Sequence, residues 1–398
     1  MSNETAMDLV HDTEGQVDAS SPVREIGPDS ARKGPEQGIA LCLSGGGYRA
    51  MLFHLGSIQR LHEVGLLPKL KRISSVSGGS ITAGMLALNW TKLMASNSAE
   101  SFSELVANPI RQLASHTIDA VSIISGALLP GSIADKVVNQ YKKHLFGDAT
   151  LQDLPDAPRF VINATNVQTG SLWRFSKPYM GDWQVGRVPH PQTLLAVAVA
   201  ASSAFPPVLS PLELDLEGVQ YDDTKAPYDS PPYTTKVILT DGGVYDNLGL
   251  ETAWKRYDTI LVSDGGGKMG ADPEPKDDWV RHSKRILDLI DNQVRSLRKR
   301  QVIDSFKNHA RKGTYWGIRT NIRGYGLDDS LDCDIAKTTI LGNTPTRLKA
   351  LDDARQKQLI NWGYAVCDAA LRSATLRQQL DETFTPPGGF PYPEVGIG

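Results

Sequence analysis

The residues best suited to chemistry lie in three glycine-rich loops, each of which follows an apolar run typical of a strand. The loops contain Gly45 to Gly47, Ser77 and Asp241. A serine hydroxyl becomes a strong nucleophile only when a neighbouring base takes its proton, and the oxyanion formed by its attack needs N–H donors. Together the loops therefore offer the parts of an acyl-transfer site.

The first loop is Ser44-Gly45-Gly46-Gly47-Tyr48-Arg49-Ala50, between a strand and a helical pattern. Three consecutive glycines let the backbone approach a ligand closely, and the start of the next helix favours an oxyanion or a phosphate. Gly45-x-Gly47-x-x-Ala50 also matches the dinucleotide-binding pattern, which requires an acidic residue at the end of the second strand. That strand ends in Ser74-Ser75-Val76-Ser77, so this alternative lacks its ribose ligand. A purely structural turn is the remaining alternative, and it needs fewer glycines.

The second loop, Ser75-Val76-Ser77-Gly78-Gly79, resembles the nucleophile elbow G-x-S-x-G, a sharp turn from strand to helix that exposes a serine. Ser75 occupies the position at which the pattern has glycine. The alternative is a serine- and glycine-rich turn with no catalytic role. Ser77 belongs to the strand-helix unit that follows the glycine loop. Neighbouring parallel strands would therefore bring both loops to the same edge of the sheet.

The third loop is Asp241-Gly242-Gly243, at the end of the apolar run 236–240. Asp-Gly by default marks a turn, but an aspartate is also the base that Ser77 needs. We expect Asp246 and Asn247 to cap the following helix. A further glycine run, residues 263–268, has no helix behind it, and we expect a surface loop that lines the site.

Histidine is the usual base of a serine hydrolase, and the chain has eight histidines. The order Ser…Asp…His makes His282 and His309 eligible for a triad. Both belong to a charged helical stretch, so we expect them to be solvated. His54 lies among apolar residues behind the glycine loop, and we expect it to be buried and hydrogen-bonded.

The elements that must position these loops read as alternating strands and helices. Hydrophobic residues make up 40% of the 398 residues, enough for a large core. The pattern indicates one mixed α/β domain with helical insertions. We expect strands at 38–43, up to Val76, 159–163, 236–240 and 259–263, and helices over about 100–148, 279–312 and 346–378.

The composition argues against several classes of protein. Lys and Arg number 42 against 45 Asp and Glu, a net charge of -3, so no overall field favours nucleic acid. The three cysteines form no C-x-x-C pair and no His, Asp and Glu cluster has metal-ligand spacing, so we expect neither metal nor cofactor. The chain shows no signal peptide and no run of about 18 apolar residues. We expect a cytoplasmic protein, peripheral where it meets membranes.

The order of glycine loop, serine elbow and distant Asp-Gly-Gly resembles the patatin-like phospholipases over most of residues 38–265. The Ser-Gly-Gly-Gly-x-Arg form is especially similar to the cytosolic phospholipases of that superfamily. Ala196 to Pro207 is similar to the Ala-Ser-x-Ala-x-Pro segment that these proteins carry between serine and aspartate. Ser44, where plant patatins have aspartate, and Ser75 depart from the pattern; Ser75 puts catalytic efficiency in doubt.

The resemblance implies a three-layer patatin-like α/β fold, with a central, mostly parallel sheet flanked by helices and with helical insertions. It implies a catalytic dyad of Ser77 and Asp241 without histidine, and an oxyanion held by Gly45, Gly46 and Gly47. It also implies that Arg49 meets a lipid phosphate, for which an ordinary surface cation is the alternative.

The corresponding domain organisation is a catalytic domain at 38–380 between a disordered segment, 1–37, and a flexible tail, 381–398. Within the domain we expect a helical insertion at about 100–148, which includes residues 121–130 and is a candidate lid, and a helical C-terminal part at about 279–380. The basic amphipathic stretch 281–312 fits either an anionic membrane surface or a core-packed helix with a solvated face.

The expected activity is hydrolysis of phospholipid or lysophospholipid esters, with the lipid or membrane surface as partner and no nucleic acid. The alternatives are a neutral-lipid or small-ester hydrolase with the same dyad, and a catalytically weak, lipid-binding regulatory protein. The sequence identifies no activator or regulatory partner.

Overall fold

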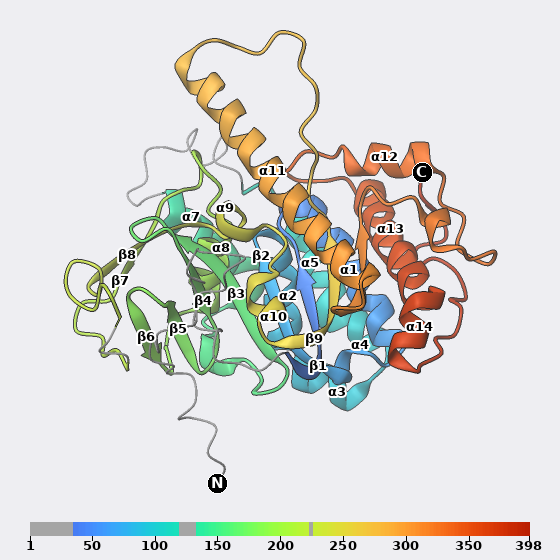
Figure 1. Ribbon diagram of the computed structural model, residues 1–398, viewed down its shortest axis with the longest axis horizontal. Helices are drawn as coiled ribbons and strands as arrows, with labels where there is room; N and C mark the ends of the chain where they lie inside the picture. Colours follow the sequence, from blue (N-terminus) through green and yellow to red (C-terminus); the bar gives the residue numbers. More distant parts are fainter. Residues whose placement is uncertain (1–34, 119–132, 223–225) are drawn as a thin grey trace, which may run out of the picture.

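The fold is built around strand β1, Glu36–Leu43, whose last four residues are buried on both faces of a sheet. The computed structural model describes residues 35–118, 133–222 and 226–398 (Figure 1). Almost all of the segment expected to be disordered, and residues 119–132 of the candidate lid, lie outside the described residues. A continuous apolar run such as that of β1 is typical of a central strand in a parallel sheet.

The sheet has ten strands in the order β10-β9-β1-β2-β3-β4-β5-β6, with β8 on β3 and β7 on β8. The five strands from β10 to β3 are parallel, and the rest pair antiparallel. The remaining bounds are β2 Leu70–Val76, β3 Arg159–Asn166, β4 Ser171–Phe175, β5 Tyr179–Asp182, β6 Gly186–Pro189, β7 Leu212–Asp215, β8 Lys236–Asp241, β9 Tyr257–Asp264 and β10 Lys312–Gly317.

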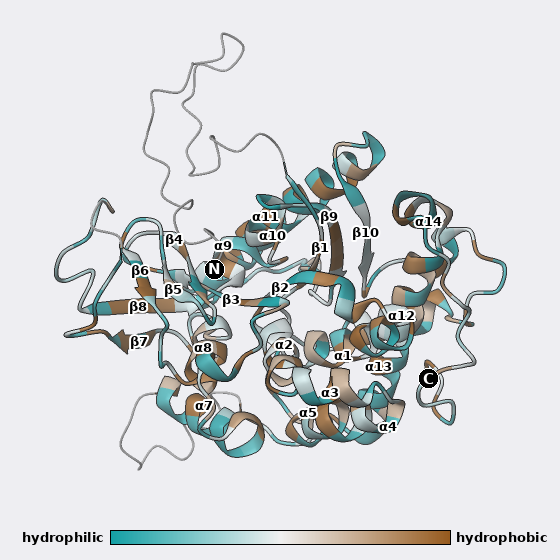
Figure 2. Cartoon of the chain, turned by 90° about the horizontal axis from the view of Figure 1, so that it is seen from below, coloured by the Kyte–Doolittle hydropathy of each residue, from teal (hydrophilic) through white to brown (hydrophobic). Residues whose placement is uncertain are grey.

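Helices cover both faces of the sheet (Figure 2). Along β1, Leu41 and Leu43 belong to one buried cluster, which includes α1, α2 and α13, whereas Ala40 and Cys42 face another, which includes α10. The alternation of side chains along a strand thus produces the three layers. The helices are α1 Gly47–Glu63, α2 Gly78–Leu88, α3 Trp90–Ser96, α4 Ala99–Phe102, α5 Asn108–Ala114, α7 Ile133–Tyr141, α8 Leu195–Ser202, α9 Gly243–Asp246, α10 Glu251–Trp254, α11 Trp279–Lys307, α12 Ile335–Gly342, α13 Asp353–Arg372 and α14 Ala374–Leu380.

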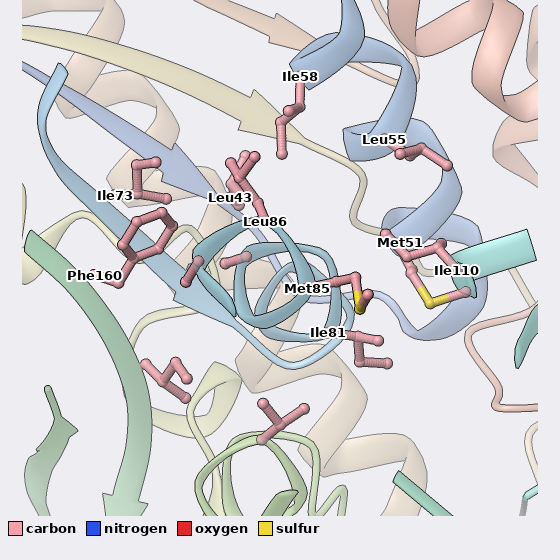
Figure 3. Close-up of a cluster of buried hydrophobic side chains, with 14 of the residues drawn as sticks. Leu43, Met51, Leu55, Ile58, Ile73, Ile81, Met85, Leu86, Ile110 and Phe160 are labelled. Carbon is pink, nitrogen blue, oxygen red and sulfur yellow. The ribbon is translucent and has the colours of Figure 1, made fainter. Parts of the chain in front are cut away.

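Helix α2, which starts directly after Ser77, lies in the middle of the larger core (Figure 3). Its side chains Ile81, Met85 and Leu86 are buried among residues from β1, β2, β3, α1 and α5. Helix α2 is therefore held on several sides, and the turn at Ser77 that begins it has little freedom to move.

The structure differs from the sequence-based expectations in the C-terminal third. Helix α11 ends at Lys307 rather than near Lys312, and β10 follows it as an edge strand that pairs with β9. The segment 381–398, expected to be a flexible tail, instead packs against α13: Phe384 and Ile397 are buried, and Asn361 donates to two carbonyls of the segment.

Helices α1 and α13 cross so closely that glycine is required on both. A Cβ atom on Gly56 would lie 1.9 Å from the carbonyl oxygen of Ile360, and one on Gly363 would lie 1.8 Å from that of Phe53. Two backbones in direct contact cannot yield by a rotamer change.

We expect Gly363→Ala to lower the free energy of unfolding by more than about 2 kcal/mol, because α13 must move away from α1. Urea denaturation measures this change. The control is Gly324→Ala, where a Cβ meets nothing within 4 Å, and it should change stability by less than about 0.5 kcal/mol. Equal effects of the two substitutions would contradict the close crossing.

Candidate active site

Strands β2 and β8 meet end to end along one edge of β3. Val76 of β2 pairs with Asn163, and the next residue, Ala164, pairs with Asp241 of β8. Strand β4 occupies the opposite edge of β3, so β2 and β8 share one edge and run toward each other. Ser77 follows Val76 and Asp241 ends β8, and the register therefore brings the two predicted residues together.

Ser77 has the strained backbone of a nucleophile elbow, with φ 51° and ψ -119°. The turn leaves no room for larger neighbours: a Cβ on Gly78 would lie 2.2 Å from the carbonyl oxygen of Gly47, and one on Gly79 would lie 2.5 Å from that of Leu43. Ser75 is accommodated, because it is buried and accepts a 3.0 Å hydrogen bond from the Ser80 hydroxyl.

The hydroxyl of Ser77 lies close enough to the carboxylate of Asp241 to stabilise its charged form. Oδ1 of Asp241 also accepts from the amide of Gly243 at 2.7 Å. Ser77 is 7% exposed and Asp241 is 3% exposed. Burial raises the pKa of Asp241 to about 7, the hydrogen bond from Gly243 and the nearby hydroxyl of Ser77 act in the opposite direction, and the negative charge of Asp291 adds to the rise. A carboxylate with a pKa near neutrality is a far better base than an ordinary aspartate.

The end of α8 fastens the serine loop to the aspartate loop. The hydroxyl of Ser202 accepts from the Ser77 amide at 2.9 Å, and its carbonyl accepts from the Gly242 amide at 3.2 Å. The carbonyl of Ala204 accepts from the Asp241 amide at 3.0 Å. The Ala-Ser-x-Ala segment noted in the sequence thus holds Ser77 and Asp241 at a fixed distance from each other.

The glycine loop lies against the elbow, since a Cβ on Gly45 would stand 3.2 Å from the Cβ of Ser77. The Gly45 amide, expected among the oxyanion donors, instead donates to the carbonyl of Asn247 at 3.0 Å. Within the described part of the chain, the amides of Gly46 and Gly47 have no acceptor. Their φ values of 142° and 60° favour glycine, and the two amides are the predicted donors that stay available.

Arg49 is buried, with 2% exposure, so the alternative of an ordinary surface cation is wrong. Its Nε donates to the carbonyl of Gly265 at 3.0 Å and its Nη1 donates to that of Thr344, whereas Nη2 has no partner within the described residues. Burial, and then the charge of Arg295, lower the pKa of Arg49 to about 10, so it stays a cation at neutral pH. A spare, desolvated donor beside Gly46 suits an anionic oxygen.

His54 has the structural role expected for it. Its Nδ1 lies 2.8 Å from Oγ of Ser263 and its Nε2 lies 2.9 Å from the carbonyl of Ser44, and burial lowers its pKa to about 4. His282 and His309 are exposed, as expected.

The loop at 263–268, expected on the surface, is buried as far as Gly266. The amide of Gly265 donates to Oγ of Ser44 at 2.8 Å. The loop therefore packs against the glycine loop and helps to hold it in place.

Sequence reasoning missed two residues of the site. Neither Asp246 nor Asn247 is the expected cap, because Leu250 is the N-cap residue of α10. Asp246 ends α9 and accepts from the amides of Leu248 and Glu251, whereas Asn247 faces the site. Its Oδ1 lies 2.3 Å from the position of a Cβ on Gly45. Asp291 acts on Asp241 from α11, and nothing in the local sequence signals this.

The described residues hold no group of three or more His, Cys, Asp or Glu side chains arranged to bind a metal ion. Among them, no helix combines the length and the apolar character needed to cross a membrane.

The sequence model of the family described as patatin-like phospholipase matches residues 41–254, more than half of the chain, including the loops that contain Gly45 to Gly47, Ser77 and Asp241. The chain belongs to the patatin-like phospholipase family. This membership agrees with the α/β fold described above and sets aside the dinucleotide alternative for the glycine loop.

Comparison with individual proteins gives more distant likenesses. Triacylglycerol lipase ptl3 of Schizosaccharomyces pombe is 31% identical over 181 residues, which is 42% of this chain and 32% of that protein. Human GIVD cytosolic phospholipase A2 shares 12% identity with a TM-score of 0.47, over 87% of this chain and 63% of that one. VipD from Legionella pneumophila shares 15% identity with a TM-score of 0.33, over 84% and 67%. The chain thus matches about a third of the length of the yeast lipase.

We expect Asp241→Asn to stabilise the protein at alkaline but not at acidic pH. Between about pH 4 and 7 the unfolded chain ionises Asp241 whereas the folded chain keeps it protonated, so this group lowers stability as pH rises and has no further effect above about 7. The difference in free energy of unfolding between variant and wild type should therefore increase by roughly 2–4 kcal/mol from pH 4 to pH 8. Urea denaturation at both pH values measures it, with the exposed Asp215→Asn as control. A difference that does not change with pH would mean that Asp241 is ionised normally.

Proposed function

We propose that this protein hydrolyses fatty-acyl esters of phospholipids or lysophospholipids through the Ser77–Asp241 dyad. The juxtaposition of Ser77 and a buried carboxyl of near-neutral pKa, at the junction of β2 and β8, carries the proposal. It joins a nucleophile and a base in the arrangement that acyl transfer requires.

The geometry supports a two-step reaction. Asp241 accepts the proton of Ser77 while Oγ attacks the ester carbonyl carbon, and the amides of Gly46 and Gly47 stabilise the oxyanion, at roughly 3 kcal/mol per donor. When the intermediate collapses, the bond to the alcohol breaks and Asp241 gives its proton to the leaving oxygen. Water then attacks the acyl-enzyme, Asp241 takes a proton from the water and returns it to Ser77, and the fatty acid leaves.

Arg49 favours a phospholipid over a neutral substrate. Its buried cation lies beside Gly46 with one N–H group unused, and a phosphodiester oxygen is a suitable acceptor for it. A neutral glyceride offers no charged group there.

A neutral-lipid substrate is the second candidate, because the yeast relative is named a triacylglycerol lipase. The third candidate, a catalytically weak lipid-binding protein, was motivated by Ser75. The hydrogen bonds of Ser75 and the intact contact between Ser77 and Asp241 favour a working nucleophile instead.

We expect Ser77→Ala and Asp241→Asn to lower fatty-acid release at least about 10³-fold, because each removes one half of the dyad. Mass spectrometry of vesicles that contain phospholipids, lysophospholipids and triacylglycerol measures the release and identifies the lipid consumed. Selective loss of triacylglycerol would support the second candidate.

If wild type releases nothing, a fluorophosphonate probe decides between the remaining candidates. Covalent labelling of wild type but not of Ser77→Ala would show a competent nucleophile that acts on another ester. Absence of labelling would reject the catalytic proposal.

We expect Arg49→Lys to lower kcat/KM for phospholipid about 10- to 100-fold and for a neutral nitrophenyl ester less than about 3-fold, because lysine cannot keep the carbonyl bonds and also bind a phosphate. The measured quantity is the ratio of kcat/KM for phospholipid to kcat/KM for the neutral ester. A substitution that merely distorts the site lowers both values and leaves this ratio unchanged. The control is Arg60→Lys, a buried arginine that is bound to Asp368. A ratio equal to that of wild type would remove Arg49 from phosphate recognition.

A further inference from the structure

Helix α11 presents its charged side to the protein. Nη1 of Arg298 lies 3.1 Å from Oε2 of Glu251, and Nζ of Lys299 lies 4.6 Å from the centroid of the Tyr315 ring. Nη1 of Arg295 lies 2.3 Å from the position of a Cβ on Gly266, in the loop that supports the glycine loop. Of the 29 residues of α11, only two near its C-terminal end are buried, and the helix extends well beyond the sheet (Figure 1).

The opposite side of α11 is an exposed apolar row. Trp279, Ile286, Ile290 and Leu297, here called the α11 stripe, are spaced by seven, four and seven residues, which places them within about 20° of one line along a helix. Their exposed fractions are 82%, 42%, 52% and 57%. The row is about 27 Å long. A surface helix of a globular protein normally buries such a row and exposes its charges, so α11 has the reverse orientation.

The apolar surface continues beside the dyad loops. Helix α11 packs against α9, which follows Asp241, and Val244 of α9 is 52% exposed. Nζ of Lys284 lies 5.9 Å from the ring centroid of Phe205, which is itself 39% exposed, next to the segment that fastens Ser77 to Asp241. Helix α11, which carries the stripe, therefore packs against elements that adjoin the candidate active site.

The exposed charges of α11 favour an anionic occupant. Four of its cations are exposed, Arg281, Lys284, Arg300 and Lys307, against one exposed aspartate, Asp304. A second copy of the chain would bring the same positive excess against it, whereas anionic lipid headgroups would neutralise it. An exposed tryptophan at the end of such a row is typical of a side chain at a membrane interface.

We propose that the α11 stripe inserts into the surface of an anionic membrane and thereby holds the Ser77–Asp241 site against its lipid substrate. The proposal rests on the lipid-hydrolase function proposed above and adds to it the surface that docks. The face that meets the membrane is the one that α11 turns away from Asp264, Glu251 and Tyr315.

The test is co-sedimentation of the full chain with vesicles of phosphatidylcholine, with and without an equal amount of phosphatidylglycerol. The variant is Trp279→Ala together with Ile290→Gln. The matched control is Trp183→Ala together with Val219→Gln, which are 46% and 37% exposed, with Trp183 between β5 and β6 at the opposite end of the sheet from β10. We expect wild type and control to bind anionic vesicles more tightly than neutral ones, and the stripe variant to bind anionic vesicles about tenfold or more weakly.

Hydrolysis of a soluble short-chain ester separates this proposal from the function on which it rests. The stripe variant should hydrolyse that ester like wild type, whereas Ser77→Ala should lose hydrolysis and keep vesicle binding. Failure of wild type to hydrolyse any ester rejects the function alone. Equal vesicle binding by the stripe variant and wild type, no binding by wild type, or a dimer that dissociates in the variant would overturn the membrane proposal; the last result would assign the stripe to a second copy.

Discussion

The meeting of β2 and β8 on one edge of β3 is the constraint on which the rest of the site depends. A parallel strand and an antiparallel strand that share an edge must stop before they collide, and the residues at the two ends then face each other. Ser77 is held there with φ 51°, against its backbone preference, by contacts that only Gly78 and Gly79 allow. The nucleophile is therefore positioned by the sheet and the core rather than by a mobile loop.

The same junction removes Asp241 from water, and this has two consequences. The fold is less stable where Asp241 is ionised, because few donors replace the lost hydration. The carboxyl also has a pKa of about 7, which an ordinary aspartate does not have. In the proposed dyad of Ser77 and Asp241, desolvation of the aspartate thus supplies the basicity that imidazole supplies in other serine hydrolases. A water-exposed Asp241 would keep the geometry and lose the base.

Much of this could be predicted from the sequence, because apolar runs that end in glycine-rich loops identify strands and their functional ends. The loops of Ser77 and Asp241 were found in this way. The antiparallel direction of β8 could not be predicted, since a short buried strand has the same composition in either direction. The Gly45 amide is not available as an oxyanion donor because it donates to the carbonyl of Asn247. This contact joins residues about 200 positions apart, so the local sequence does not reveal it. Strand β10 was missed because the helical pattern before it continues almost to Lys312 and hides where α11 stops.

Helix α11 shows why amphipathicity alone does not determine orientation. Its sequence has one apolar and one charged face, and a core-packed helix would bury the first. Ion pairs and ring contacts with Glu251 and Tyr315 hold the charged face inward instead, where burial strengthens them. The apolar row is then left outside at an energetic cost in water, a cost that disappears when the row meets hydrocarbon. A helix held in this way needs no conformational change to bind lipid, because its apolar face is already displayed. Helix α11 also packs against α9, whose exposed Val244 lies three residues beyond Asp241.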